Sequence, residues 1–317
     1  MRFIMEQQQN VTPPVPPESG GKRFMHLWGP LLIKWGIAFA TMMAGAMVCS
    51  FLYMSAHYDT AMKAMENQDQ MMNLYNAILE ELMKWQTVIE GAAAFITIPV
   101  MIVLFHRDRV RERVSGILPN KKAPVWKYGA VLVMSVAMCW GLNNLIAISG
   151  VSALSSSYEE TMEVLYTPPL LIQIICLGVL IPVCEELVFR GLMFKRLRAR
   201  GGYMQAAIYS SVVFSILHVN LVQMIYSFVL GMMLAYIYEK YGSIKAPAAA
   251  HVVMNIFSVL ATKYELLEWL SADIMRIGIV TVVCAAVAAT MFVFIQRIEE
   301  RPDYPNKPGE NENLAAV

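Results

Sequence analysis

Long apolar runs recur along the chain, and they constrain its fold more than any other feature. A run of about 17 to 25 mostly apolar residues lets a helix cross the hydrocarbon core of a membrane. Only helices and closed barrels can span that core, because it offers no water to the backbone. Runs without apolar–polar alternation favour helices. Eight such runs lie at 30–54, 85–105, 126–149, 169–190, 203–219, 222–239, 244–262 and 275–296. The sequence therefore predicts an all-α fold, a polytopic integral membrane helix bundle with about eight transmembrane helices.

Composition agrees with a membrane protein. Hydrophobic residues make up 57% of the chain and charged residues only 15%, which is too apolar for a soluble domain of 317 residues. The net charge of +1 gives no indication of nucleic-acid binding. The lipid bilayer is therefore the partner that composition predicts.

Lysine and arginine are unevenly distributed between the runs. They crowd the second and fourth connections, at Arg107, Arg109, Arg111, Arg113, Lys121, Lys122, Lys127, Lys195, Arg196, Arg198 and Arg200. The first and third connections carry mainly acidic residues. Connections rich in Lys and Arg stay in the cytoplasm, so we expect both termini to be cytoplasmic. We expect the membrane to be a bacterial plasma membrane.

These patterns divide the chain into five parts. Residues 1–29 form a polar cytoplasmic N-terminal segment, and 30–168 contain the first three transmembrane helices with their connections. Residues 169–262 form a helical core that contains the candidate site, and 263–298 contain the eighth helix. The segment 299–317 is rich in Pro, Asn, Gly and charge, which predicts a disordered cytoplasmic tail.

A charged motif interrupts the fourth apolar run. Glu185, Glu186 and Arg190 lie in a sequence that is otherwise apolar, and ionisable residues inside a membrane indicate a functional site. Glu186 and Arg190 are one helical turn apart and can pair. Glu185 is rotated by about 100° from Glu186 and has no local partner, so it is the candidate general base. The alternative is a structural triad at the cytoplasmic interface.

A histidine lies at the end of the next run. His218 follows Phe214 by one turn. If the chain turns at Gly201 and Gly202, Glu185 and His218 both lie about 24 Å from that turn and can meet at one depth. The alternative is a histidine that only packs in the core.

A second polar pair lies in the seventh run. His251 and Asn255 are one turn apart on one helix face, where they could stabilise an oxyanion or clamp two helices together. His251 is only about 10 Å from the start of its helix, so tilt or a long extension of the fourth helix must bring it level with Glu185. Lys34 and Glu90 are interpreted as helix-end residues that reach the membrane surface.

Together, the motifs EELVFRG, FSILH and HVVMN resemble the family of CAAX proteases and bacteriocin-processing enzymes (CPBP). The resemblance covers about residues 169–262. It implies an eight-helix intramembrane glutamic endopeptidase, a hydrolase whose polar cavity opens toward the cytoplasm. Members similar to the eukaryotic Ras-converting enzyme remove the last three residues of prenylated proteins. The implied partner is a membrane-associated protein or peptide substrate, with lipidated CAAX proteins among the candidates.

The resemblance also implies roles for individual residues. Glu185 would activate a water molecule, and His218 would help to position it. His251 and Asn255 would stabilise the oxyanion. Glu186 and Arg190 would support this arrangement.

Metal dependence is left open by residue type. Glu185, Glu186, His218 and His251 could all bind zinc, but the chain has no HExxH motif. Asn255 is a poor zinc ligand, and one carboxylate is expected to pair with Arg190. We therefore favour a glutamate mechanism without a cofactor and keep zinc as the alternative.

Two other classes of protein are compatible with the sequence. A catalytically silent membrane scaffold could keep the fold and regulate partners in envelope maintenance or peptide immunity, although a scaffold has no chemical need for an unpaired Glu185. A transporter could use a carboxylate as a proton relay. It would need broken helices in matching halves, and Pro182 alone does not form that pattern.

Overall fold

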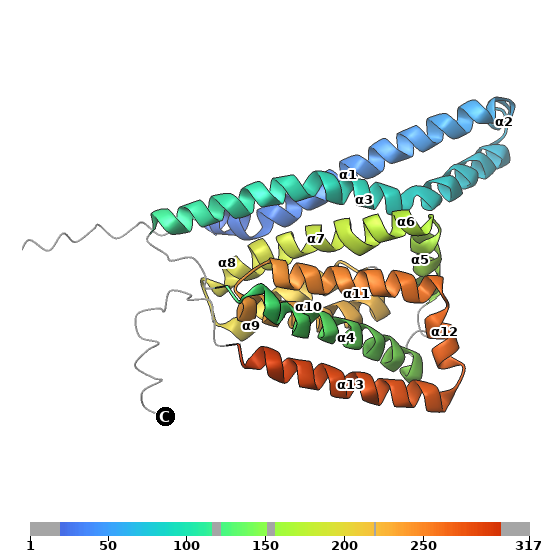
Figure 1. Cartoon of the computed structure of the whole chain (residues 1–317). Helices are drawn as coiled ribbons and strands as arrows, with labels where there is room; N and C mark the ends of the chain where they lie inside the picture. Colours follow the sequence, from blue (N-terminus) through green and yellow to red (C-terminus); the bar gives the residue numbers. More distant parts are fainter. Residues whose placement is uncertain (1–19, 116–121, 151–155, 219, 299–317) are drawn as a thin grey trace, which may run out of the picture.

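The computed structural model describes residues 20–115, 122–150, 156–218 and 220–298, and these are almost entirely helical (Figure 1). No strand occurs within these ranges. The predicted all-α bundle is confirmed. The expected tail at 299–317 lies outside the described residues.

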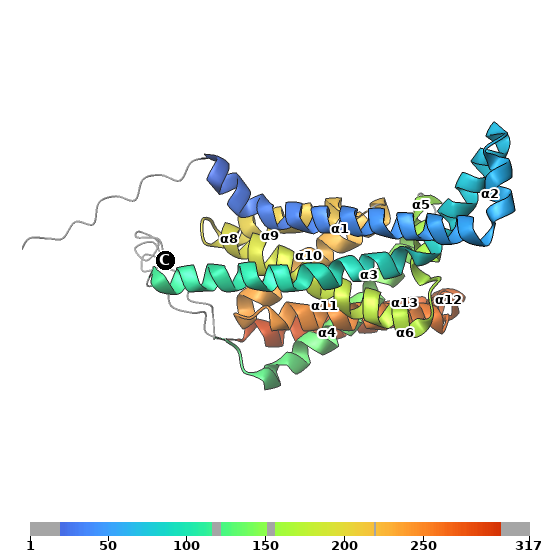
Figure 2. The ribbon, with the colours of Figure 1, turned by 90° about the horizontal axis from the view of Figure 1, so that it is seen from above.

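The first three helices form a long hairpin along one face of the bundle. Helix α1 (Gly20–Ala56) and α3 (Gln68–Val114) run side by side and are joined by the short α2 (Tyr58–Ala64) (Figure 2). At 47 residues, α3 is about 70 Å long, more than twice the hydrocarbon thickness of a bilayer. The α2 end of the hairpin therefore projects beyond the other helices (Figure 1). Residues 20–29, expected in the polar N-terminal segment, form the first turns of α1.

The fourth run forms one long helical stretch with irregular turns. It consists of α6 (Leu170–Gln173), η3 (Ile174–Leu180), α7 (Ile181–Glu186), η4 (Leu187–Phe194) and α8 (Lys195–Arg198). The η3 and η4 segments are π-helical, a conformation that often occurs at functional sites. The candidate carboxylates lie between these two segments.

The other helices enclose this stretch. Helices α9 (Tyr203–Ile216), α10 (Leu221–Tyr241) and α11 (Lys245–Lys263) follow it. Helix α4 (Tyr128–Ser149), which continues the short η1 (Val125–Lys127), packs against α11 and α13 (Ile274–Gln296). The short helices α5 (Ser156–Tyr166) and α12 (Leu266–Ser271) lie at the end of the bundle opposite α8 (Figure 1).

Within the described residues, each of the eight predicted runs contains a helix, but these helices are not equally suited to cross a membrane. Among the described residues, six helical segments are long and apolar enough, namely 20–56, 68–114, 125–149, 170–198, 221–241 and 274–296. Helix α9 has 14 residues, fewer than a full crossing needs. Helix α11 carries the polar candidates His251 and Asn255. The chain is an integral membrane protein, and the expected count of eight is approximate.

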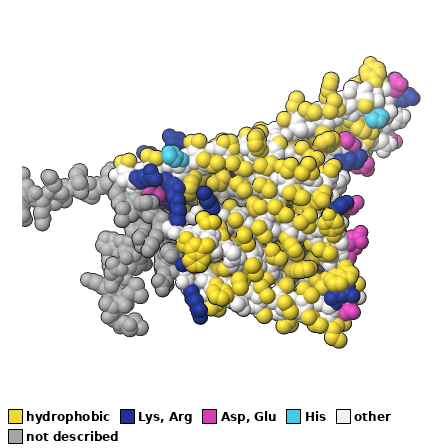
Figure 3. All heavy atoms as spheres, in the orientation of Figure 1, with side chains coloured by type: hydrophobic (Ala, Val, Ile, Leu, Met, Phe, Trp, Pro, Cys, Tyr) yellow, Lys and Arg dark blue, Asp and Glu magenta, His cyan; other side chains and the backbone are white. Residues whose placement is uncertain are grey.

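Charge is separated between the two ends of the bundle. Figure 3 shows a broad hydrophobic band with Lys and Arg at the α8 end and mainly Asp and Glu at the other end. At the α8 end, Arg196 pairs with Asp108 at 2.6 Å and Arg198 with Glu239 at 3.0 Å. These ion pairs tie α8 to α3 and α10. The described chain begins and ends at this same end (Figure 1).

Candidate functional site

Glu186 and Arg190 form a buried ion pair beneath the site. Both side chains are 0% exposed, and Arg190 Nη1 donates to Glu186 Oε1 over 2.7 Å. This is the pair predicted from their spacing. The Arg190 guanidinium also lies 4.6 Å from the centre of the Phe214 ring, a favourable cation–π contact. The fold therefore gives the buried cation two partners.

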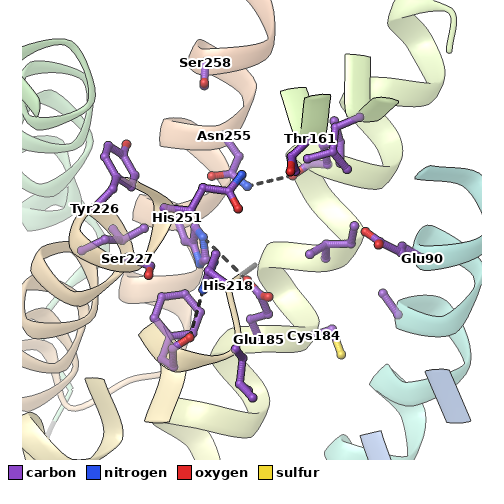
Figure 4. A pocket seen from close by; sticks show the side chains of 18 of the residues that line it. Glu90, Thr161, Cys184, Glu185, His218, Tyr226, Ser227, His251, Asn255 and Ser258 are labelled. Carbon is purple, nitrogen blue, oxygen red and sulfur yellow. Dashed lines mark hydrogen bonds and ion pairs between the residues drawn. The ribbon is translucent and has the colours of Figure 1, made fainter. Parts of the chain in front are cut away.

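His251 connects the two adjacent carboxylates. Its Nδ1 lies 3.0 Å from Glu186 Oε1. Its Nε2 faces Glu185, 4.0 Å from Oε2 (Figure 4). When Nδ1 carries a proton and donates to Glu186, the neutral ring leaves Nε2 as an acceptor. Only the doubly protonated ring can donate from both nitrogens. The ion pair with Arg190 thus fixes the orientation of a ring that faces Glu185.

Helix packing explains how His251 reaches the depth of Glu185. A Cβ atom added to Gly191 would lie 3.6 Å from Ile244 Cδ1, and one added to Gly178 would lie 2.8 Å from Ile256 Cγ1. Ile244 precedes His251 and lies beside Gly191, whereas Ile256 follows His251 and lies beside Gly178. Helix α11 therefore runs antiparallel to the fourth run. The extension of that run to Arg198 lets α11 begin deep in the bundle. The long extension anticipated from the sequence is therefore present.

Lys34 enters the site from α1. Its Nζ lies 3.7 Å from Glu185 Oε1, so Glu185 has a charged neighbour that the sequence did not indicate. Lys34 and Glu90 were expected near helix ends, and that interpretation is wrong. Helix α1 begins 14 residues before Lys34 and α3 begins 22 residues before Glu90. Hydropathy alone does not show that α1 and α3 continue as helices into the more polar sequence before each apolar run.

His218 lies just after α9 ends. Its Nδ1 contacts the Phe214 carbonyl oxygen at 3.0 Å, and its ring packs on the edge of Phe214 with centroids 4.9 Å apart. Phe214 also packs edge-on against His251 with centroids 6.0 Å apart. One aromatic ring therefore spaces the two histidines, and both line the cavity that contains Glu185.

Asn255 is held by the irregular backbone of η3. Its Nδ2 donates to the Leu177 carbonyl oxygen over 2.9 Å. In a π-helix that carbonyl would accept from the residue five positions later, which is Pro182 and has no N–H. Proline thus leaves the Leu177 carbonyl available for Asn255. One amide N–H is used in this way, and the second remains for a ligand.

The site opens into a cavity of about 450 Å³. Beyond Glu185 its walls lie toward the α5 end, and they include Tyr158, Thr161, Asn143, Gln223, Tyr226 and Ser258. On the α8 side, Val188, Phe189 and Leu192 belong to a buried apolar cluster. The resemblance implied a cavity open to the cytoplasm, whereas the cavity extends away from the Lys- and Arg-rich end. The distribution of Lys and Arg thus predicts that the α8 end is cytoplasmic. A cavity open to the cytoplasm would instead require the α5 end to be cytoplasmic.

The four zinc candidates do not form a zinc site in this arrangement. Glu186 Oε1 is already bonded to Arg190 and His251, and His218 directs Nδ1 at a backbone carbonyl. Within the described part of the chain, no three His, Cys, Asp or Glu side chains converge as metal ligands do. We therefore derive no step that involves a metal.

The fold and the site define a polytopic helical membrane protein in which Glu185, two histidines and an asparagine line an intramembrane cavity, with the Glu186–Arg190 pair buried behind them. Residues 167–257 match the family model described as Type II CAAX prenyl endopeptidase Rce1-like. This segment contains all six motif residues from Glu185 to Asn255. The predicted resemblance to CAAX proteases is confirmed over this segment.

A curated relative agrees with this match. The chain is 29% identical over 113 residues to the Bacillus subtilis (strain 168) protein named "Putative membrane peptidase YdiL". The aligned part covers 36% of this chain and 46% of that protein, so the chain spans less than half the length of this relative. No solved structure matches the chain.

Proposed function

We propose that this protein is an intramembrane endopeptidase that hydrolyses a peptide bond of a membrane-associated protein or peptide. The observation that carries the proposal is the chain of contacts from Arg190 through Glu186 and His251 to Glu185, which ends at the cavity. A structural clamp does not need Glu185 to face open space. The names of the matched family and of the relative also support a peptidase.

The proposed reaction uses water activated by Glu185. Glu185 accepts a proton from a water molecule while the water oxygen bonds to the carbonyl carbon of the substrate. The carbonyl oxygen becomes negatively charged and receives hydrogen bonds from the second N–H of Asn255 and from the His251 ring. Glu185 then gives its proton to the amide nitrogen as the C–N bond breaks. The products are a carboxylic acid and an amine.

The other site residues position these groups. His218 would hold the water beside Glu185, and Lys34 would keep a positive charge next to that carboxylate. Glu186 and Arg190 would fix His251 from behind. Because both are fully buried, they act through His251 and do not touch the substrate.

Orientation and location are part of the same proposal. The concentration of Lys and Arg at the α8 end (Figure 3) supports cytoplasmic N and C termini. The similarity to a Bacillus subtilis protein supports a bacterial plasma membrane. A catalytically silent scaffold remains the alternative from another class.

The first test is an activity assay on the full chain in detergent. Quenched-fluorescent peptides would include transmembrane segments and farnesylated CAAX sequences, and each would be assayed with and without a metal chelator. We expect cleavage by the wild type that survives chelation and falls about 10²-fold or more in Glu185→Gln. Glu90→Gln changes another carboxylate of the same cavity and should keep activity. Chelation that abolishes cleavage, with recovery on adding zinc, would contradict the metal-free mechanism.

A second comparison separates the peptidase from the scaffold. If wild type and Glu185→Gln fold equally well and neither cleaves any peptide, the scaffold is favoured. If both cleave at equal rates, Glu185 is not the general base.

A further inference from the structure

A second cavity lies at the Lys- and Arg-rich end, separate from the proposed active site. It measures about 80 Å³. Five cationic side chains from four segments line it, namely Arg109, Arg113, Lys122, Lys195 and Lys245. Among the described residues, Glu112 is the only acid in this lining. So many like charges around a small space repel one another unless an anion lies between them.

Packing holds two of these cations together. The ring of Phe105 lies 5.2 Å from Lys195 Nζ and 5.3 Å from Arg109 Cζ. Glu112 Oε2 pairs with Lys195 at 2.7 Å and so compensates one charge. The remaining four cations of the lining are not balanced by an acid of the same cavity. A phosphate group suits this arrangement, since guanidinium and ammonium groups bind its oxygens strongly.

A buried tyrosine adds a neutral donor. Tyr238 is 2% exposed and lines the cavity. Its side chain lines the cavity, and its hydroxyl forms no hydrogen bond with another described residue. A buried hydroxyl normally has a partner. The cavity is therefore where a ligand oxygen would meet it.

We infer that the cavity lies near the membrane surface. Ala123 N donates to the Tyr241 carbonyl oxygen over 3.0 Å, which fixes the segment carrying Lys122 beside the end of α10. Three residues after Ala123, the side chain of Trp126 is 78% exposed. Exposed tryptophan marks the headgroup region of membrane proteins. A lipid phosphate can therefore reach the cavity from the surrounding leaflet.

We propose that this cavity binds a phosphate-bearing anion, supplied by the headgroup of an anionic phospholipid. The proposal is independent of peptidase activity. Binding would tie α3, α8, α10 and α11 together at one end of the bundle. Basic pockets between transmembrane helices on the cytoplasmic side can bind anionic headgroups in this way.

The test measures thermal unfolding of the full-length protein in uncharged detergent at constant ionic strength. The ligands are short-chain phosphatidylglycerol, short-chain phosphatidylcholine and inorganic phosphate. We expect phosphatidylglycerol to raise Tm and phosphatidylcholine to have little effect. Inorganic phosphate reproducing the shift would identify a free anion as the ligand, which overturns the lipid assignment while the phosphate site stands.

Matched variants locate the effect. Arg113→Gln/Lys245→Gln removes two exposed charges of the cavity and should weaken phosphatidylglycerol binding about tenfold or more. Arg23→Gln/Arg107→Gln removes two exposed charges that do not line it and should leave binding unchanged. Tyr238→Phe should weaken binding with the packing kept. Equal losses in both double variants would overturn the proposal, because they would indicate diffuse surface charge.

Discussion

The ammonium group of Lys34 lies 3.7 Å from the Glu185 carboxylate, although the two residues are about 150 positions apart in the chain. Lys34 belongs to α1, which packs along α3 on one face of the bundle. The aliphatic stem of Lys34 can follow the apolar surface while its charged end enters the cavity. Helix α1 therefore contributes to the site as well as to the membrane anchor.

Lys34→Met should lower kcat/KM about tenfold or more, because Glu185 would lose its nearest cation. Lys34→Arg should retain much of the activity, since the charge is kept. The control is Lys63→Met on exposed α2, which makes the same chemical change far from the site. Wild-type kinetics for Lys34→Met would rule out a role for this contact.

The two adjacent glutamates should differ in their effects on stability. Glu186→Gln leaves Arg190 buried without its ionic partner, which typically costs about 3–5 kcal/mol. Glu185→Gln should leave the melting temperature almost unchanged while activity is lost. Thermal unfolding in detergent measures both variants. Glu186→Gln/Arg190→Met removes both charges and should recover part of the stability, and a double variant no better than Glu186→Gln would argue against the pair.

The crossing of η3 and α11 depends on a glycine. In Gly178→Ala the new Cβ would lie 2.8 Å from Ile256 Cγ1, so we expect a loss of about 1–3 kcal/mol from overpacking. The control Gly129→Ala meets no atom within 4 Å and should be neutral or stabilising. In a double-mutant cycle, Gly178→Ala combined with Ile256→Ala should lose less stability than the sum of the two single losses, because the smaller side chain relieves the close contact. Simple additivity of the two losses would contradict this packing.

The side from which the cavity is reached can be measured without a substrate. A cysteine at Thr161, where α5 forms part of the cavity wall, should react with a membrane-impermeant maleimide in right-side-out vesicles. A cysteine at Lys122, at the opposite end, should react in inverted vesicles. The wild type with its five cysteines gives the background. Reaction of Thr161→Cys only in inverted vesicles would reverse the proposed orientation or the side of access.

Asp273, at the start of α13, should make a contribution to stability that depends on pH. Its carboxylate accepts from the backbone N–H groups of Met275 and Arg276, and these bonds lower the pKa of Asp273. The contribution should therefore be present above the unfolded-state pKa and fall as pH decreases through the lower folded-state pKa.

The Tm difference between the wild type and Asp273→Ala should accordingly shrink in acid. Asp273→Asn keeps a capping oxygen without the charge, so its difference from Asp273→Ala should not depend on pH. A constant gap between the wild type and Asp273→Ala across the acid range would show that ionisation of Asp273 is not involved.

The apolar runs determine the fold class, because a run of that length has no stable alternative to a helix in a membrane. Local spacing also determines the pair of Glu186 and Arg190, since residues one turn apart share a helix face. The three motifs point to residues that the fold brings close together. Their order along the chain does not give the distances between them.

Only the tertiary structure decides the contacts between helices. Lys34 reaches Glu185, and His251 bonds Glu186, because α1 and α11 pack against the fourth run in a particular register. Asn255 finds Leu177 because Pro182 frees a carbonyl in a π-helical segment, which hydropathy cannot reveal. The direction of the cavity likewise depends on which helix ends leave space between them. These features arise from side-chain packing between distant segments, whereas the sequence pattern reports only on each segment alone.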